Sequence, residues 1–161
     1  MGRGEHVTTI AFDGKSLAAD RLADDHMSVR KIFTLKDGTH VAGSGYYDQL
    51  VEVAAWLDAG AKRDDRPAFP DDLGEGSEII MVKKDGTAYW LTWPYLRPVL
   101  INETTAAVGS GALGALTAMA AGCNAKRAVQ LCSRYDKGTG KGVDVVHIKP
   151  EPKAKARGKR A

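Results

Sequence analysis

The sequence predicts an α+β fold in which two antiparallel sheets stack face to face and helices cover their outer sides. Strand-like runs occur in pairs, and several pairs enclose an Asp-Gly turn, which is typical of β-hairpins. Helix-like segments follow the first group of strands and precede the last strand. Each sheet has to bury one face, and stacking the two sheets under covering helices satisfies both. The 161 residues suggest one domain.

The first half of the chain predicts two hairpins. Their strand-like runs are residues 7–12, 15–20, 30–35 and 40–45. Asp13-Gly14 separates the first two runs, and the tetrapeptide KDGT at 36–39 separates the other two. Turns of this composition between apolar runs favour antiparallel pairing.

A helix is predicted next, because apolar residues recur at helical spacing. These residues are Tyr47, Leu50, Val51, Ala54 and Leu57. Gly60 is placed to end the helix. Residues 61–77 are rich in Pro, Asp and Gly and lack periodicity, so we expect a long surface loop there.

The second half predicts a third hairpin, more strands and two more helices. KDGT recurs at 84–87, and the strand-like runs are 78–83, 88–93, 97–101, 105–111 and 142–148. One helix is expected from near Ser110 to Gly122, and Asn124 is expected to cap another. The small side chains of the first helix predict that another element approaches it closely.

Charge is distributed unevenly along the chain. The net charge is +3, but residues 149–161 carry +5, and the remaining 17 basic and 19 acidic residues give −2. We expect 149–161 to form a disordered basic tail, because it has little that could pack into a core. A slightly acidic body argues against a nucleic-acid-binding protein. The chain has no apolar run of membrane-spanning length and no signal peptide, which predicts a cytoplasmic protein without a membrane partner.

The two cysteines, Cys123 and Cys132, are expected to be small buried hydrophobic residues rather than a disulfide or a nucleophile. No other ligands stand at metal-binding spacing around them. The composition therefore predicts no metal or cofactor.

Thr8 suggests a chemical function if it becomes the first residue of the mature protein. Its hydroxyl is a weak nucleophile and needs a base within hydrogen-bonding reach. The α-amine of the same residue, with a pKa of about 7.7–8.0, can serve as that base. A nearby cation would keep the amine neutral, and backbone N–H groups would bind the oxyanion. Strand propensity is the alternative explanation of the Thr8-Thr9 pair.

The sequence supplies a candidate for each of these requirements. The candidates stand near the ends of predicted strands and helices, and they are Asp20, Lys31, Gly43, Ser110, Asp136 and Thr139. Each also has an ordinary structural explanation: a turn cap, a solvated charge, a turn glycine, a helix N-cap and two loop hydrogen-bonding residues, respectively. Their joint order along the chain is what indicates a function.

That order resembles the proteasome β-type family of N-terminal nucleophile (Ntn) hydrolases, most closely its HslV-like peptidases. The stretches TTIAFDGKSLAAD, RKIFTL with HVAGSG, AAVGSGALGA and DKGTG carry the resemblance. It spans the chain from Thr8 to about Ile148. The resemblance implies a four-layer αββα sandwich and a threonine endopeptidase.

The resemblance also implies a role for each candidate. Thr8 would be the nucleophile, with its own amine as general base. Lys31 would tune both groups electrostatically, and Asp20 would orient Lys31. Gly43 would donate its N–H to the oxyanion.

Three further residues, Ser110, Asp136 and Thr139, would hold the amine and a proton-relay water. The resemblance implies a homo-oligomeric ring that cleaves peptides or unfolded proteins delivered by an AAA+ unfoldase ATPase. It also implies that backbone carbonyls near Ser133, Asp136 and Thr139 can hold a monovalent cation. Aromatic residues at 89, 90, 93 and 95 are expected in core or subunit packing.

Residues 1–7 are expected to be a leader that is removed or a mis-assigned translation start, with residues 8–148 forming the domain. Val7 stands where self-processing members of the family have Gly. A GTG codon encodes Val internally but starts translation as Met, so the protein could begin at position 7. If the leader stays attached, the alternative is an inactive structural or assembly protein. A small-molecule Ntn amidohydrolase is a further alternative.

Overall fold

The computed structural model describes residues 8–23, 27–68, 77–92 and 94–148, so the expected leader and basic tail lie outside the described residues. The strands of the first half are β1 (Ile10–Phe12), β2 (Ser16–Asp20), β3 (Leu22–Ala23), β4 (Met27–Ser28), β5 (Ile32–Thr34) and β6 (His40–Ser44). Helix α1 (Tyr47–Asp58) and the 3-10 turn η1 (Arg63–Asp65) follow. The second half forms β7 (Glu78–Val82), β8 (Ala88–Thr92), β9 (Arg97–Leu100), β10 (Ala106–Val108), α2 (Ala112–Ala120), α3 (Ala125–Cys132) and β11 (Val143–His147).

The strands form two main antiparallel sheets. One has the strand order β10-β1-β2-β11, and the other has the order β5-β6-β7-β8-β9. The two-residue strands β3 and β4, which the sequence did not predict, pair with each other. The predicted α+β class with antiparallel hairpins is confirmed.

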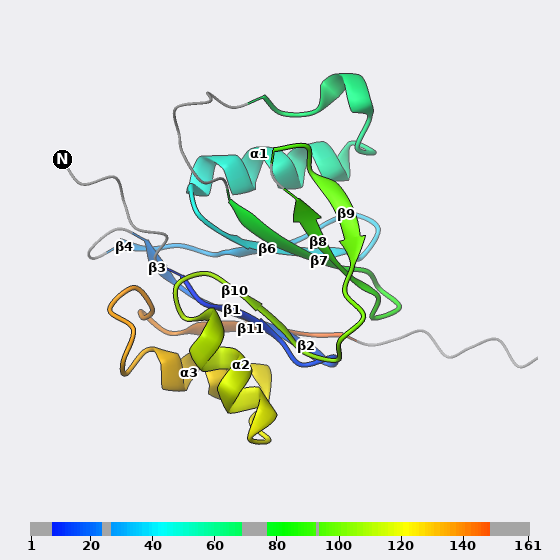
Figure 1. The fold of residues 1–161 in the computed structure, drawn as a ribbon. Coiled ribbons are helices and arrows are strands. Elements are labelled where there is room, and N and C mark those ends of the chain that lie inside the picture. Colours follow the sequence, from blue (N-terminus) through cyan, green and yellow to red (C-terminus); the bar gives the residue numbers. More distant parts are fainter. Residues whose placement is uncertain (1–7, 24–26, 69–76, 93, 149–161) are drawn as a thin grey trace, which may run out of the picture.

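Three apolar clusters hold these elements together. Helix α1 lies on one side of the five-stranded sheet, and α2 and α3 lie beside the four-stranded sheet (Figure 1). Alternate residues of β1 point to opposite sides, as a strand requires: Ile10 and Phe12 join a cluster with β6, β7 and β8, whereas Ala11 joins a cluster with α2 and α3. The third cluster packs α1 on the five-stranded sheet.

The buried face of α1 differs from the predicted one. Tyr47 and Val51 are each 39% exposed, so they do not belong to the buried stripe as expected. The helix instead buries Gln49 and Val53 beside Leu50 and Ala54. Gln49 Oε1 accepts a 2.7 Å hydrogen bond from Ser77 Oγ, whereas its buried Nε2 has no hydrogen-bond partner among the described residues.

The small side chains of α2 admit α3 closely, as predicted. A Cβ on Gly114 would lie 3.2 Å from Cys132 Sγ, so a larger residue there would push the helices apart. Cys132 is buried, but Cys123 is only half-buried, which corrects the expectation that both are core residues. Both thiols are free. None of the helices in the described ranges is both long and apolar enough to cross a membrane.

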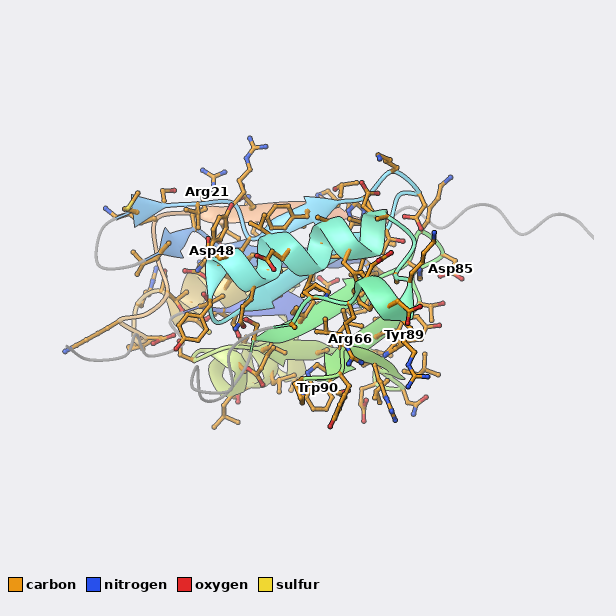
Figure 2. The ribbon with its side chains drawn as sticks, turned by 90° about the horizontal axis from the view of Figure 1, so that it is seen from above. Arg21, Asp48, Arg66, Asp85, Tyr89 and Trp90 are labelled. Carbon is orange, nitrogen blue, oxygen red and sulfur yellow. The ribbon has the colours of Figure 1, made fainter. Side chains whose placement is uncertain are left out.

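The aromatic residues of the third hairpin are less buried than core packing requires. Tyr89 packs partly on the α1 cluster, but Trp90 is 42% exposed and, with Arg66, lies toward the same edge of the molecule in Figure 2. Tyr95 is 57% exposed, and the guanidinium carbons of Arg66 and Arg97 lie 5.5 and 5.6 Å from the centre of its ring. Position 93 lies outside the described residues.

Candidate functional site

Thr8, Lys31 and Asp20 meet in the interior. Lys31 Nζ donates a 2.6 Å hydrogen bond to Thr8 Oγ1 and a 3.0 Å hydrogen bond to Asp20 Oδ1. Asp20 ends β2, and Lys31 directly precedes β5, so the two strands fix both ends of the ion pair. Thr8 and Lys31 are each 4% exposed and Asp20 is fully buried. The solvated-charge explanation of Lys31 is therefore wrong. Asp20 does cap a turn, since it accepts the Leu22 N–H, but it also binds Lys31.

The Asp20 carboxylate is held by four donors. Oδ1 accepts hydrogen bonds from Lys31 Nζ and from the Thr9 N–H, each at 3.0 Å. Oδ2 accepts from the backbone N–H groups of Leu22 at 3.2 Å and Gly140 at 3.1 Å. Burial raises the pKa of Asp20 above its usual value, and Lys31 and the backbone donors oppose this shift. These bonds fix the carboxylate, and through it the position of Lys31.

Burial also changes the Lys31 ammonium. Desolvation lowers the pKa of Lys31 below its usual value, and the charge of Asp20 opposes the shift. A cation thus stands at hydrogen-bonding distance from the Thr8 hydroxyl in a poorly solvated place. There it stabilises negative charge on Thr8 Oγ1 more strongly than a solvated lysine would.

A second group of side chains lies at the Thr8 nitrogen. The Thr8 N–H donates to Ser110 Oγ at 3.3 Å. The hydroxyls of Ser110 and Thr139 both lie at Asp136 Oδ2, at 2.6 and 2.7 Å. Each hydroxyl has one proton, so donation to Asp136 leaves Ser110 Oγ as the acceptor for the Thr8 nitrogen.

Asp136 suits this role as a common acceptor. Its Oδ1 also accepts the Gly138 N–H at 3.1 Å. Partial burial works to raise the pKa of Asp136, but the hydrogen bonds from Ser110, Thr139 and Gly138 outweigh it, and the pKa lies below its usual value. A carboxylate that stays ionised keeps both hydroxyls oriented.

Two glycines before α2 make room for this site. A Cβ on Gly109 would lie 2.1 Å from the Thr8 carbonyl oxygen, and a Cβ on Gly111 would lie 1.9 Å from Thr9 Oγ1. Gly109 also has a φ of +95°, which favours glycine. Gly111 is the N-cap residue of α2, so Ser110 is not the cap, and its hydroxyl serves Thr8 and Asp136 instead.

The structure places Gly43 within β6, opposite Ile79 of β7. A Cβ there would meet Leu50 and Ile79 side chains at 3.0 Å and the Glu78 carbonyl at 3.1 Å, so packing alone favours glycine at this position. Its role as oxyanion donor stays a prediction.

The side-chain hydroxyls of Ser133 and Thr139, near which a cation is expected, both form hydrogen bonds with other groups of the protein. Ser133 Oγ donates to the Gln130 carbonyl at 2.6 Å, and Thr139 Oγ1 is bound to Asp136. No group of three or more His, Cys, Asp or Glu side chains in the described ranges could hold a metal. The expected cation would be held by backbone carbonyls near these residues, and it stays a prediction.

Sequence reasoning missed two residues at the site. Thr9 was considered only as a strand residue, yet its side chain lies 2.6 Å from Thr139 Oγ1. The pair Thr8-Thr9 was a sequence signal for this residue. Neighbouring residues of an extended segment face opposite sides, so the second threonine places another hydroxyl on the other side of the chain. Glu78 reaches the same region, where its Oε2 accepts the Gly109 N–H at 3.0 Å. No sequence pattern indicated this carboxylate.

Comparison with known proteins supports the fold. No protein-family profile and no curated protein matches the chain. A solved structure of Thiobacillus denitrificans BPH in complex with epoxomicin is similar, with a TM-score of 0.63 and 18% sequence identity over 89% of this chain and 99% of that chain. Another structure of Thiobacillus denitrificans BPH gives a TM-score of 0.59 and 19% identity over the same shares. Likeness at this level of identity shows a common fold.

Proposed function

We propose that this chain is a threonine-type endopeptidase in which the Thr8 hydroxyl attacks peptide carbonyls. The observation that carries the proposal is the convergence of two separate groups on one residue. A buried ion pair, Lys31 with Asp20, contacts the Thr8 hydroxyl. A carboxylate with two hydroxyls contacts the Thr8 nitrogen through Ser110. A threonine that served only as a strand residue would need neither group.

The reaction needs the α-amine of Thr8 to be free. Thr8 Oγ1 bonds to the substrate carbonyl carbon while its proton passes to the amine, directly or through a water. The C–N bond then breaks as the ammonium returns this proton to the leaving amine, and an acyl ester remains on Thr8. Water adds to the ester carbon while its proton passes to the amine. The C–O bond then breaks as the ammonium returns this proton to Thr8 Oγ1, which releases the acid and restores Thr8.

Lys31 and Asp20 act on the nucleophile. The ammonium donates to Thr8 Oγ1, so the oxygen keeps a lone pair for attack and its own proton points elsewhere. Its positive charge stabilises the alkoxide as it forms and disfavours protonation of the nearby amine. Asp20 fixes Lys31 in place without touching the substrate.

Ser110, Asp136 and Thr139 act on the base. Ser110 Oγ accepts a hydrogen bond from the Thr8 nitrogen, which fixes the orientation of the amine. The lone pair of the amine then points toward the proton of Thr8 Oγ1. Gly43, on the strand next to β5, is proposed to donate its N–H to the oxyanion.

The likeness to Thiobacillus denitrificans BPH supports the finer fold proposal, the four-layer αββα sandwich of the Ntn hydrolases. One of its structures contains epoxomicin. We propose that the Thr8 site of this chain binds the same compound, which would make epoxomicin a suitable competitor in the assays below.

We also propose that the chain forms a cytoplasmic homo-oligomeric ring. This ring would receive unfolded proteins from an AAA+ unfoldase. An apolar surface on β8 and β9 supports self-association: Trp90, Val99 and Leu100 are 42%, 46% and 51% exposed. Pro98 has no N–H group, so β9 lacks one backbone hydrogen-bond donor, and this disfavours the addition of another strand at this edge. Side-chain packing between subunits is the remaining way to cover this surface.

The leader defines a second candidate function. With Val7 attached, the Thr8 nitrogen is an amide and cannot act as a base. A protein that kept residues 1–7 would be a structural or assembly protein with the same fold.

Hydrolysis of a fluorogenic peptide distinguishes the two candidates. The assay compares the full chain, a chain expressed as Met followed by Thr8, and its Thr8→Ala variant, each with the N-terminal residue established by mass spectrometry. Turnover by the chain that begins at Thr8, and by neither of the others, supports the peptidase. Absence of turnover with peptides and with a cognate unfoldase supports the assembly protein.

A further inference from the structure

Thr9 is buried and polar, and it contacts both groups that surround Thr8. It is 0% exposed, and its hydroxyl oxygen lies 2.6 Å from Thr139 Oγ1. Its backbone N–H donates to Asp20 Oδ1, the oxygen that also accepts from Lys31. Because the backbone and the side chain contact opposite groups, this residue links the ion pair to the Asp136 cluster.

The direction of the Thr9–Thr139 hydrogen bond follows from proton counting. Thr139 has one hydroxyl proton, and it lies toward Asp136 Oδ2 at 2.7 Å. Thr139 can therefore only accept at 2.6 Å from Thr9, which is the donor. Hydrogen bonds in series polarise one another, so the Thr9 donation strengthens the bond from Thr139 to Asp136.

The space around Thr9 fits this hydroxyl closely. A Cβ on Gly111 would lie 1.9 Å from Thr9 Oγ1, so the turn before α2 leaves room for the oxygen because residue 111 is glycine. Cys132 is the neighbouring thiol. Burial and the charge of Asp136 raise the pKa of Cys132, and a side-chain hydrogen bond with Thr9 opposes this shift.

We propose that Thr9 is a positioning residue for the Thr8 reaction. Its hydroxyl orients Thr139 and Asp136, and these orient Ser110 on the Thr8 nitrogen. Its amide helps hold Asp20 and Lys31 on the Thr8 hydroxyl. The catalytic part of this role rests on the proposed function, whereas the effect of Thr9 on Asp136 does not.

The test uses Thr9→Val, which keeps the shape and removes the hydroxyl, and Thr9→Ser, which restores it. Thr39→Val is the matched control, because Thr39 is also buried (1% exposed) and its hydroxyl binds the Asp37 carboxylate in the turn 36–39. All proteins begin at Thr8. The measurements are kcat and KM for a fluorogenic peptide and the pKa of the Asp136 carboxyl, followed by carbon NMR.

We expect Thr9→Val to lower kcat roughly tenfold or more with little change in KM, the size expected when one hydrogen bond to a charged network is lost. The Asp136 pKa should rise in Thr9→Val and return in Thr9→Ser. Thr39→Val should change neither quantity. If Thr9→Val does not fold, Thr9→Cys, a weaker donor of similar size, should give the same changes in smaller measure.

The outcomes separate this proposal from the peptidase proposal. A wild type that is inactive with peptides and with a cognate unfoldase, but whose Asp136 pKa still responds to Thr9→Val, would refute the peptidase and leave Thr9 as the residue that orients Asp136. An active Thr9→Val protein with an unchanged Asp136 pKa would overturn the role of Thr9 and leave the peptidase intact. Absence of both activity and pKa response would overturn both.

Discussion

Lys31 Nζ lies 2.6 Å from Thr8 Oγ1, although the chain between them forms a complete hairpin. The same nitrogen lies 3.0 Å from Asp20 Oδ1, and the side chains of this ion pair are 5% and 1% exposed. Burying such a pair is expensive in free energy and is a poor way to stabilise a fold. Its position against a hydroxyl is better explained by the chemistry proposed for that hydroxyl.

Replacing Lys31 with Met separates stability from activity. Loss of the cation leaves Asp20 buried without its main partner, which costs about 3–5 kcal/mol of unfolding free energy. Adding Asp20→Asn should recover much of this loss. Peptide turnover should stay absent in both variants, because the ammonium at Thr8 is missing. Chemical denaturation and the fluorogenic assay measure the two effects, and activity in the double variant would refute the role of Lys31.

Activity should fall at alkaline pH when Lys31 loses its proton. Burial lowers the pKa of Lys31, so this loss begins below the usual value of 10.5. Lys31→Arg keeps its charge at every accessible pH. We expect Lys31→Arg to be less active than the wild type, because the guanidinium has a different shape. Its kcat should nevertheless begin to fall at a higher pH than that of the wild type. The measurement is kcat from pH 7 to 11, and identical declines in the two proteins would contradict the prediction.

Asp136 should stabilise the protein in a pH-dependent way. Its folded-state pKa lies below the usual 3.8, so its stabilising effect is fully present above 3.8 and is lost as the pH falls through the lowered value. The difference in unfolding free energy between wild type and Asp136→Asn should therefore shrink on acidification below about pH 4. Urea denaturation from pH 6 to 2.5 tests this. A difference that grows toward acid would contradict it.

Gly111→Ala should abolish activity through steric conflict. The new Cβ would lie 1.9 Å from Thr9 Oγ1, so the start of α2 has to move away from the Thr8 residue. Gly140→Ala is the control, because its Cβ would meet only Leu22 Cδ2, at 4.0 Å, and its N–H to Asp20 is retained. Turnover and circular dichroism of both variants make the comparison. Equal losses would show that the effect is not local to Thr9.

The sequence predicted the hairpins and helices because turn residues and apolar periodicity are local signals. It also predicted the residues that converge on Thr8: Asp20, Lys31, Ser110, Asp136 and Thr139. The buried face of α1 was misassigned, because the contact of Gln49 with Ser77 is tertiary and leaves no periodic pattern. Glu78 was missed for the same reason, since its contact with Gly109 is tertiary. Thr9 was missed because strand propensity already explained the Thr8-Thr9 pair.

We propose that Thr8 is the nucleophile when its amine is free. The most direct measurement is the intact mass of the protein that begins at Thr8 after exposure to a peptide vinyl sulfone, an electrophile that captures activated nucleophiles, followed by peptide mapping. We expect one adduct per chain on Thr8. Epoxomicin should reduce it, and it should be absent from Thr8→Ala and from a full chain that retains residues 1–7. A chain that begins at Thr8 and stays unlabelled, or that carries the adduct on Cys123 or Cys132, would contradict this proposal.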